Sequence, residues 1–530
     1  MAVAVSANGA PLVAAAVRPR LSLRILLAVA SGLLLSASFP SIDLEPLAWI
    51  GLVPLLLAAR GLRPRLAFAV GWLGGLVFFL ATTYWVAYTI ANYTAVPMVL
   101  AVGILVIMAS VLALYHGAFI AGVRWFEDRS LPAIWLAPAL WVTLEWLRSW
   151  FFIGFPWAAL GYSQYRYHDL AQMVEVTGIY GVSALLVLFN VVVAAVVRDR
   201  GHRPARLLPA MVALTLLVIG IPLAGKWRAA ALSRAPAAGH LRVALAQGNV
   251  QQDHKWDPAY QDDTMGRYRD LTVEAAAERP DLVVWPETAT PFFFQQPGPR
   301  RDEVLELAEK QNIHLLFGSP AARQDRSGEI QELNRAYLVS PKGTELATYD
   351  KMVLVPFGEY VPYRRVLFFV DRLVEAIGTV VPGIHPTVFD LPQARFGVLI
   401  CYEDVFPALT RLFIRDGGDF LVNITNDAWY GPTSAPYQHL AHATFRSIEN
   451  RVPLVRTANT GISAVIGIDG RILWRGPLFE PLQHTADIAW PRVHTFYTRF
   501  GDVFAWLCVL ASALAFLYGA LQWRRSGRRT

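Results

Sequence analysis

Cys401 is one of only two cysteines in the 530-residue chain, and it ends a strand-like apolar run at 395–401 with acidic residues directly after it. A thiol at the end of a buried strand is well placed to act as a nucleophile, although a lone cysteine on an apolar run is more often a small core residue. The other cysteine, Cys508, lies inside a long apolar stretch. We therefore expect no disulfide, and two cysteines exclude a metal site built on thiolates. Chemistry at Cys401 requires partners elsewhere in the chain.

Partners for the thiol are expected among polar side chains at the ends of other strands, where catalytic groups collect in covered sheets. Glu287 follows the apolar run 281–285 through Pro286, and Lys351 precedes an apolar run that ends at Glu359. Taken alone, Glu287 is typical of a solvated carboxylate at the end of a strand, and Lys351 is typical of a surface ammonium group. Together, a carboxylate that takes the thiol proton and an ammonium group that stabilises an oxyanion would support acyl transfer through a thioester.

The elements that would position these residues lie between about 226 and 500, where short β-branched runs alternate with polar helix-like stretches. Strands are predicted at 241–247, 281–285, 314–318, 336–340, 396–401, 420–425, 454–457 and 463–468. Helices are predicted at about 260–278, 301–312, 405–416 and 435–451. Several of the strands are continuous apolar runs, which is typical of sheets covered on both faces. This segment is predicted to be an α/β domain.

The rest of the chain is too apolar for an ordinary soluble protein, since 55% of all residues are hydrophobic and only 16% are charged. Runs of membrane-spanning length occur at about 22–40, 44–60, 66–88, 96–123, 131–147, 171–197, 207–225 and 502–523. We expect about eight transmembrane helices, with the α/β domain inserted between the last two. The predicted parts are a helical bundle at 1–225, the inserted domain at 226–500, and a final span with a basic tail at 501–530.

The orientation of these spans is predicted from basic residues, which are retained on the cytoplasmic side. Alternate connections carry them: Arg18, Arg20, Arg24, Arg60, Arg63, Arg65, Arg124, Arg129, Arg198, Arg200, Arg203, Arg206, Arg524, Arg525, Arg528 and Arg529. Both termini are therefore expected in the cytoplasm and the inserted domain on the opposite side. The basic tail explains much of the net charge of +7, so no nucleic-acid partner is expected.

Several residues allow two interpretations. The first span is either a membrane anchor or a cleavable signal peptide, because small residues at 36–38 follow its apolar run. Glu145, near the end of an apolar span, is either functional or paired with Arg148. His439 and His442 lie three apart on a predicted helix, where packing or capping is favoured over a metal site.

Three motifs in order resemble those of the nitrilase superfamily, over about 240–490. They are Trp285-Pro286-Glu287, the segment from Lys351 to Glu359, and Cys401-Tyr402-Glu403. A nitrilase-like domain inserted before the last of about eight spans is similar to one family in particular, the apolipoprotein N-acyltransferases. The segments 154–157 and 161–164, after the fifth span, look like a characteristic part of that family.

The resemblance implies a polytopic α-helical membrane bundle with an inserted nitrilase-like α-β-β-α sandwich. It implies that Glu287 is the general base, Lys351 the oxyanion stabiliser and Cys401 the nucleophile. Supporting residues matched in the same way are Glu359, Tyr402, Glu403, Asn334 and Trp256. No cofactor and no metal are implied.

The implied reaction takes a fatty acyl chain from a phospholipid acyl donor and passes it to the N-terminal amine of a diacylglyceryl apolipoprotein acceptor. The implied location is the bacterial inner membrane, with the catalytic domain on the periplasmic side. Residues 288–300 and 357–369 are predicted membrane-facing arms. A membrane-anchored amidase or other hydrolase of the superfamily is the first alternative, and a transporter or lipid-binding protein that has lost catalysis is the second.

Overall fold

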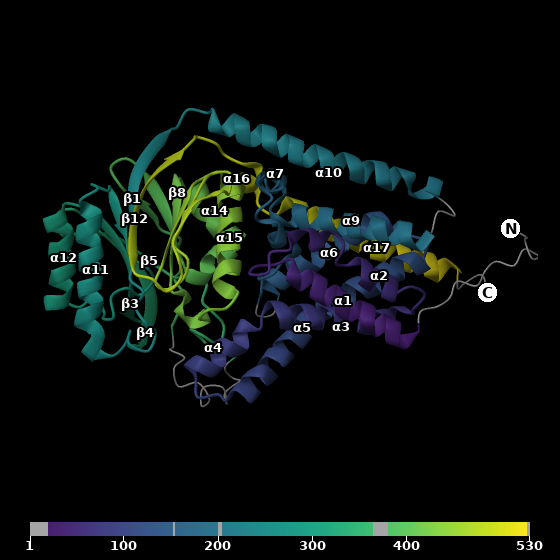
Figure 1. The fold of residues 1–530 in the computed structure, drawn as a ribbon, viewed down its shortest axis with the longest axis horizontal. Helices are drawn as coiled ribbons and strands as arrows, with labels where there is room; N and C mark the ends of the chain where they lie inside the picture. The colour runs from purple at the N-terminus through teal and green to yellow at the C-terminus, as the bar shows by residue number, and fades with distance from the viewer. Residues whose placement is uncertain (1–19, 152–153, 200–203, 364–379, 527–530) are drawn as a thin grey trace, which may run out of the picture.

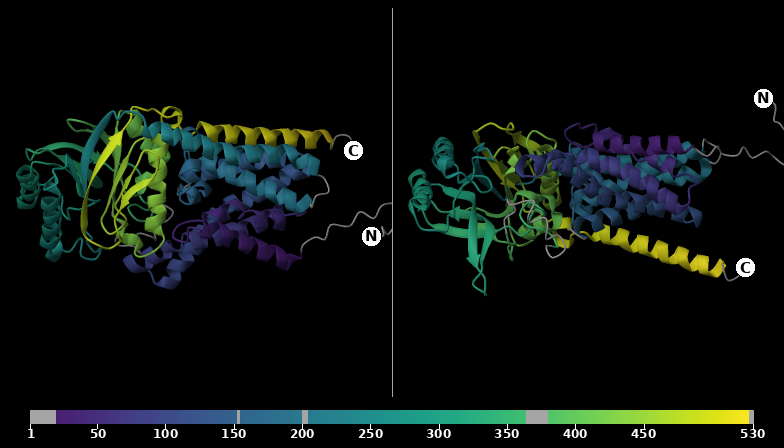
Figure 2. Two further views of the ribbon diagram at one scale, coloured as in Figure 1. Left: turned by 45° about the horizontal axis from the view of Figure 1, so that its top comes forward. Right: turned by 90° about the horizontal axis from the view of Figure 1, so that it is seen from below.

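The computed structural model describes residues 20–151, 154–199, 204–363 and 380–526. A helical part and a part built on two β-sheets lie end to end (Figures 1 and 2). The last helix, α17 (Val503–Ser526), returns from the sheet part and runs along the helical part. The chain therefore enters the sheet part from one long helix and leaves it into another.

The helical part is formed by α1 (Leu21–Ala37), α2 (Val53–Ala58), α3 (Pro64–Thr82), α4 (Trp85–Tyr93), α5 (Met98–Asp128), α6 (Ala133–Trp150), α9 (Ile179–Asp199), α10 (Pro204–Ser233) and α17. Within the described residues, five helices are long and apolar enough to cross a membrane: α3, α5, α9, α10 and α17. The predicted span at 44–60 was wrong as one helix, since a short 3-10 helix (Glu45–Trp49) precedes the six-residue α2. Pro46 and Pro54 stand at the starts of these two pieces. The total of eight spans stays a prediction.

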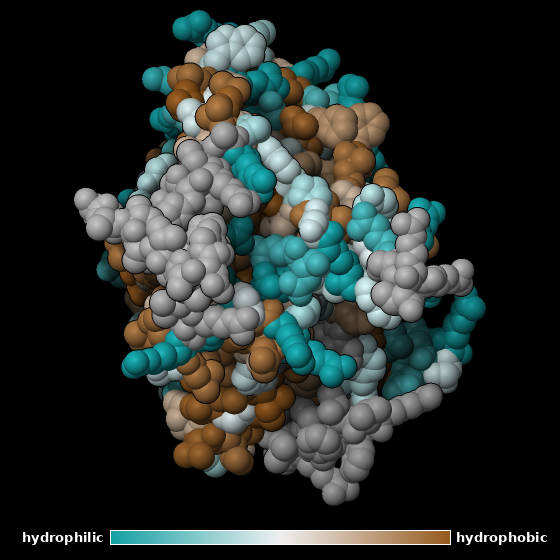
Figure 3. Space-filling model, turned by 90° about the vertical axis from the view of Figure 1, so that its right-hand side faces the viewer, coloured by the Kyte–Doolittle hydropathy of each residue, from teal (hydrophilic) through white to brown (hydrophobic). Residues whose placement is uncertain are grey.

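Arginine-bearing connections meet at the end of the helical part that lies away from the sheets. Arg24 donates to the carbonyl of Arg60 at 3.0 Å, Arg124 donates to the carbonyl of Leu62 at 3.1 Å, and Arg198 pairs with Glu127 at 2.5 Å. Helix α1 begins and α17 ends at this end (Figure 1). Seen from there, hydrophilic residues gather toward the middle of the face, with hydrophobic residues above and below them (Figure 3).

The two sheets have six strands each, in the orders β12-β1-β2-β3-β4-β5 and β11-β10-β9-β8-β7-β6. The first contains β1 (Gly239–Gln247), β2 (Leu282–Val284), β3 (His314–Gln324), β4 (Ile330–Val339), β5 (Glu345–Asp350) and β12 (Leu482–Trp490). The second contains β6 (Val388–Asp390), β7 (Arg395–Ile400), β8 (Phe420–Thr425), β9 (Leu454–Ala458), β10 (Ala464–Ile466) and β11 (Ile472–Arg475). The strands β1, β2 and β3 run parallel, as do β7, β8 and β9.

All eight predicted strands are present, and the four that the sequence pattern missed are the four edge strands β5, β6, β11 and β12. An edge strand has fewer covered positions, and the side chains of β11 and β12 are mostly half-buried or exposed. They therefore lack the continuous apolar run that marks the central strands.

Helices cover the outer faces of both sheets, which confirms the predicted α-β-β-α sandwich (Figure 1). Helices α11 (Gln261–Ala276) and α12 (Pro299–Gln311) lie on the first sheet. Helices α14 (Pro407–Arg415) and α15 (Ala435–Asn450) lie on the second, with α15 between that sheet and the helical part. Glu287 and Cys401 follow the carboxyl ends of the parallel strands β2 and β7, whereas Lys351 follows β5, which pairs antiparallel with β4.

Candidate active site

Cys401 directly follows β7 and has a left-handed backbone conformation, with φ +53°. Few residues other than glycine adopt this conformation, so the surrounding structure must hold it. The side-chain amide of Asn423, in β8, donates to the carbonyls of Leu399 and Cys401 at 3.1 and 3.2 Å. The thiol is thereby presented on a tight, fixed turn between a strand and the short 3-10 helix Cys401–Val405.

Glu287 lies just beyond β2, where β3 approaches it closely. A Cβ atom on Gly318 would lie 2.8 Å from Glu287 Cα, so only glycine permits this approach. Glu287 Oε1 accepts hydrogen bonds from Asn334 Nδ2 at 2.7 Å and Lys351 Nζ at 3.2 Å, and Oε2 accepts from the backbone N–H of Asn426 at 2.9 Å. Burial raises the pKa of Glu287, but the ammonium groups of Lys351 and Lys255 outweigh it and lower the pKa overall. Glu287 is therefore an ionised carboxylate.

Lys351 comes directly after β5 and is almost completely buried between two carboxylates. Its Nζ donates to Glu359 Oε1 at 2.9 Å as well as to Glu287, and its backbone N–H donates to the carbonyl of Asn334 at 2.8 Å. Burial lowers the pKa of Lys351, but the two carboxylates raise it well above the ordinary value. The side chain is an ammonium group with a fixed direction.

The Cys401 thiol is buried, and the charges of Glu287 and Lys351 both affect its pKa. Burial is the largest cause that raises its pKa, and the Glu287 carboxylate adds to it, while Lys351 acts in the opposite direction. The resting side chain is therefore a thiol, and a base must remove its proton before it can attack. The same cluster holds an ionised carboxylate, Glu287.

Glu359 and Asn334 complete the cluster around the lysine. Asn334 Nδ2 donates to Glu359 Oε1 at 3.1 Å as well as to Glu287, and Glu359 Oε2 accepts from the backbone N–H of Val355 at 2.8 Å. Glu287, Asn334, Lys351 and Glu359 are thus joined by direct hydrogen bonds, although they come from three separate segments.

Glu403 joins the turn at Cys401 to the segment that begins at Lys351. Its Oε2 accepts from the backbone N–H of Ile400 at 2.8 Å, and its Oε1 accepts from the backbone N–H groups of Met352 and Val353 at 2.7 and 3.1 Å. The hydroxyl of Tyr349 donates to the same Oε1 at 2.8 Å. Burial raises the pKa of Glu403 to about 7. Glu403 therefore fixes the backbone before Cys401 relative to the backbone after Lys351.

The remaining predicted residues lie at the margin of the site. Tyr402 is buried, and its ring lies nearly parallel to that of Trp157, with centroids 6.2 Å apart. Trp256 is 51% exposed. Its neighbour Lys255, which the sequence reasoning missed, is buried and donates from Nζ to the carbonyl of Glu287 at 3.1 Å. A lysine in a polar stretch carries no sequence signal that separates it from a surface charge.

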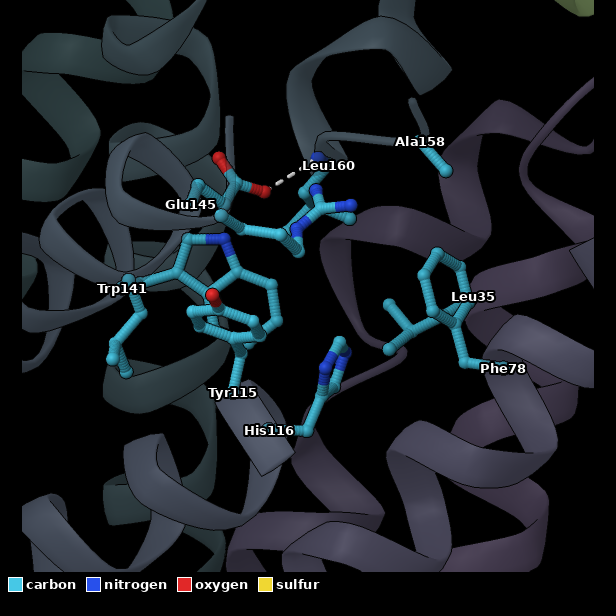
Figure 4. Close-up of a pocket in the computed structure, with 10 residues that line it drawn as sticks. Leu35, Phe78, Tyr115, His116, Trp141, Glu145, Ala158 and Leu160 are labelled. Atoms are coloured by element: carbon cyan, nitrogen blue, oxygen red, sulfur yellow. Dashed lines mark hydrogen bonds between the residues drawn. The ribbon is translucent and has the colours of Figure 1, made fainter. Parts of the chain in front are cut away.

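The segment after α6 is held against the site from within the helical part. Arg148 donates to the carbonyls of Phe155 and Trp157 at 3.1 and 2.6 Å, and Glu145 accepts from the backbone N–H of Leu160 at 2.7 Å (Figure 4). A cavity of about 20 Å³ beside them has room for about one water molecule. Glu145 and Arg148 therefore position the segment that carries Trp157.

A larger cavity of about 440 Å³ lies between the helical part and the sheet part. The helical part contributes Ser149, Trp150 and Gly154, and the sheet part contributes Val353, Leu354, Phe406 and other apolar residues. Tyr402, the residue after Cys401, lines the same cavity. Its volume is in the range of small-ligand sites, and its lining suits an apolar chain.

One of the two predicted arms was wrong. Phe294, in the stretch 288–300, is completely buried and packs against Phe317 and Tyr337 with ring centroids 4.8 and 4.9 Å apart. The stretch leads into α12, on the far side of the sheets from the helical part (Figure 1). In the other predicted arm, 357–369, residues from 364 onward lie outside the described residues.

Known proteins match this chain along nearly its whole length. A family model of the apolipoprotein N-acyltransferase N-terminal domain matches residues 31–192, and a carbon-nitrogen hydrolase model matches residues 242–495. A curated apolipoprotein N-acyltransferase from Geobacter metallireducens is 42% identical over 505 residues, which cover 94% of this chain and 95% of that protein. The chain belongs to the apolipoprotein N-acyltransferase family.

Further apolipoprotein N-acyltransferases agree with this assignment. Relatives from Chlorobaculum tepidum and Azotobacter vinelandii are 32% and 35% identical and cover 95% and 86% of this chain. The predicted resemblance is confirmed, and with it an acyltransferase with a nitrilase-like domain and a multi-pass part in the inner membrane. The segment 154–164, which carries Trp157, falls inside the first matched domain of the apolipoprotein N-acyltransferases, and Glu287, Lys351 and Cys401 fall inside the second.

Proposed function

We propose that this acyltransferase moves a fatty acyl chain from a phospholipid, through a thioester on Cys401, to the N-terminal amine of a diacylglyceryl apolipoprotein. The observation that carries the proposal is the apolar cavity between the two parts of the molecule. It has one wall from the helical part and one from the sheet part, and it reaches the residue next to the nucleophile. A hydrolase of small polar amides has no use for such a cavity.

The first half-reaction forms the thioester. Glu287 takes the proton of the Cys401 thiol, and the sulfur attacks the ester carbonyl carbon of the donor lipid. The Lys351 ammonium group and a backbone N–H after Cys401 stabilise the oxyanion, and each good donor contributes about 3–4 kcal/mol. The intermediate collapses as the ester C–O bond breaks, and the lysophospholipid alkoxide leaves with the proton that Glu287 had accepted.

The second half-reaction repeats these steps with an amine. The acceptor amine attacks the thioester carbonyl carbon while Glu287 takes a proton from the nitrogen. The C–S bond then breaks, the amide leaves, and the thiolate regains its proton. Glu359 and Asn334 serve as the residues that aim Lys351 and Glu287, and Glu403 keeps the nucleophile turn against the lysine segment.

The proposed orientation of the protein in the membrane rests on the positions of its arginines. Their connections meet at the end of the helical part away from the sheets, and basic residues are retained in the cytoplasm. The catalytic domain at 226–500 would therefore lie on the periplasmic side, next to the bilayer surface where both lipids are found. The bundle at 1–225 and the final span with its tail at 501–530 would hold it there.

The experiment is to incubate the full-length protein with phospholipid in detergent and to measure its intact mass. We expect a fatty acyl adduct on the wild-type protein and none on Cys401→Ala, which should stay folded. A diacylglyceryl lipopeptide should then discharge the adduct and yield the amide. Discharge by water alone, with release of free fatty acid at the same rate, would show a hydrolase instead. Acylation of the lipopeptide without any adduct would refute the covalent mechanism.

A further inference from the structure

His439 lies directly behind the nucleophile turn. It belongs to α15, and its Nε2 atom lies 3.3 Å from the carbonyl oxygen of Cys401. The amide of Asn423 donates to the same oxygen at 3.2 Å. The backbone of Cys401, with its left-handed φ, is therefore held by side chains from two different elements.

The imidazole of His439 stands between two buried carboxylates. Its Nδ1 lies 2.9 Å from Asp427 Oδ1, and its Nε2 lies 2.8 Å from Asp404 Oδ1. Arg456 binds the other oxygen of each carboxylate, with N···O distances of 2.9 Å to Asp404 and 2.8 Å to Asp427. All four side chains are buried, so two cations and two anions neutralise one another in this cluster.

Both ring nitrogens face carboxylate oxygens, which only accept hydrogen bonds when ionised, so the arrangement suits an imidazolium. The Arg456 guanidinium also lies 2.9 Å from His439 Nδ1. Its positive charge disfavours protonation of both ring nitrogens at once. Burial and the Arg456 guanidinium lower the pKa of His439, but Asp404 and Asp427 outweigh them and raise it to about 8. The imidazolium is the form that binds both carboxylates at neutral pH.

The neighbour of His439 is fixed from the helical part. Gln438 Nε2 donates to the carbonyls of Pro40 and Thr82 at 3.0 and 3.1 Å. Its Oε1 accepts from the indole N–H groups of Trp157 and Trp85 at 2.7 and 3.3 Å. The position of His439 along α15 is therefore set by the helical part as well as by the sheet part.

We propose that His439 is a positioning residue for acyl transfer: held between Asp404 and Asp427, it fixes the turn on which Cys401 sits. The proposal rests on the proposed role of Cys401 as the nucleophile. The thiol, not the imidazole, reacts, and His439 acts through the backbone of Cys401. Loss of the imidazolium charge removes one of the two cations that bind these carboxylates, leaves Arg456 as the other, and loosens the turn.

The groups that face the imidazole set the expected pH dependence. They are Asp404 from the turn after β7, Asp427 and Tyr430 from the turn after β8, and Arg456 from β9. His442, from α15 itself, is uncharged near neutral pH because burial lowers its pKa well below the ordinary value. The carboxylates hold the proton until the pH passes about 8. Thioester formation should therefore decline above that pH in the wild-type protein.

The test is the rate of acyl-adduct formation on Cys401 between pH 6 and pH 9, measured by intact mass on the full-length protein with phospholipid in detergent. In His439→Gln we expect the rate constant to fall at least tenfold below pH 8, the KM for phospholipid to change less than twofold, and the decline above pH 8 to vanish. Lys255, whose pKa is lowered by burial to about 8, titrates in the same range. The decline should persist in Lys255→Met, which assigns it to His439.

His442→Gln is the matched control, since this buried residue on the same helix packs on Trp157 and Tyr162 with ring centroids 5.0 and 3.9 Å apart. His442→Gln should form the adduct at the wild-type rate, within about twofold, and should show the same decline in rate above pH 8. A wild-type rate with an unchanged profile in His439→Gln would overturn the proposal. If His439→Gln does not fold, Asp404→Asn replaces it, and the decline must then move to lower pH. A wild-type protein that forms no adduct would instead refute the role of Cys401.

Discussion

The indole N–H of Trp157 donates a 2.7 Å hydrogen bond to the side-chain carbonyl of Gln438. This bond joins the segment after α6 to α15, one residue before the side chain that lies behind Cys401. The helical part is thus connected to Cys401 through polar contacts of Trp157, Gln438 and His439, and the connection can be broken by substitution.

Gln438→Leu is expected to destabilise the protein. Two carbonyls and two indole N–H groups would lose their partner, and each buried polar group left unpaired costs about 1–3 kcal/mol. The melting temperature in detergent should fall by several degrees, and thioester formation should slow. Gln324→Met, at an exposed position, is the control and should melt like the wild type. An unchanged melting temperature in Gln438→Leu would show that the contact is dispensable.

Lys351→Met is expected to abolish thioester formation and to destabilise the fold, because Glu287 and Glu359 are left as buried carboxylates without their shared cation. Breaking such a pair from one side costs about 3–5 kcal/mol. The double variant Lys351→Met, Glu359→Gln should recover much of the stability, measured by thermal unfolding, and none of the activity. Recovery of activity in the double variant would exclude Lys351 from oxyanion stabilisation.

Lys255→Met is expected to move the acidic limb of the pH–rate profile to higher pH, because the Lys255 ammonium group helps to lower the pKa of Glu287. The folded-state pKa of Lys255 lies below its ordinary value of 10.5, so the stability cost of this group accumulates as the pH falls from 10.5 to about 8 and is complete below that pH. The variant should therefore be the more stable protein at pH 7. Adduct formation and thermal unfolding across the pH range measure both effects, and a profile that does not move removes Lys255 from the site.

Val353→Trp is expected to fill part of the 440 Å³ cavity without disturbing the backbone hydrogen bond from Val353 to Glu403. Acylation by long-chain phospholipids should then slow at least fivefold relative to short-chain ones. Competition between two phospholipids in one reaction, read as the ratio of two adduct masses, measures the change directly. If long and short chains slow equally, the acyl chain does not occupy this cavity.

Sequence reasoning recovered the central strands and failed at the edges of the sheets. Buried parallel strands such as β7 and β8 are continuous apolar runs, whereas β11 and β12 have few covered positions and no distinct pattern. The span at 44–60 has a spanning length of apolar residues, but it forms a 3-10 helix at Glu45–Trp49 and a separate helix at Val53–Ala58, with Pro54 in the first turn of the second. Apolar composition alone does not determine where a helix begins and ends.

The sequence by itself determined the fold class and the family, and it pointed to three motif residues beside recognisable apolar runs. Cys401 ends one such run, Glu287 follows another through Pro286, and Lys351 precedes a third. Only the tertiary structure decided which polar residues gather around them. Lys255, Asn426 and His439 lie up to 184 positions apart in the printed numbering, yet each contacts the site. The strength of a buried ion pair depends on the distance between its charges and on their desolvation. The spacing of residues along the chain determines neither of these. For the same reason, the 440 Å³ cavity beside Tyr402, the residue after Cys401, forms only where the helical part and the sheet part pack together.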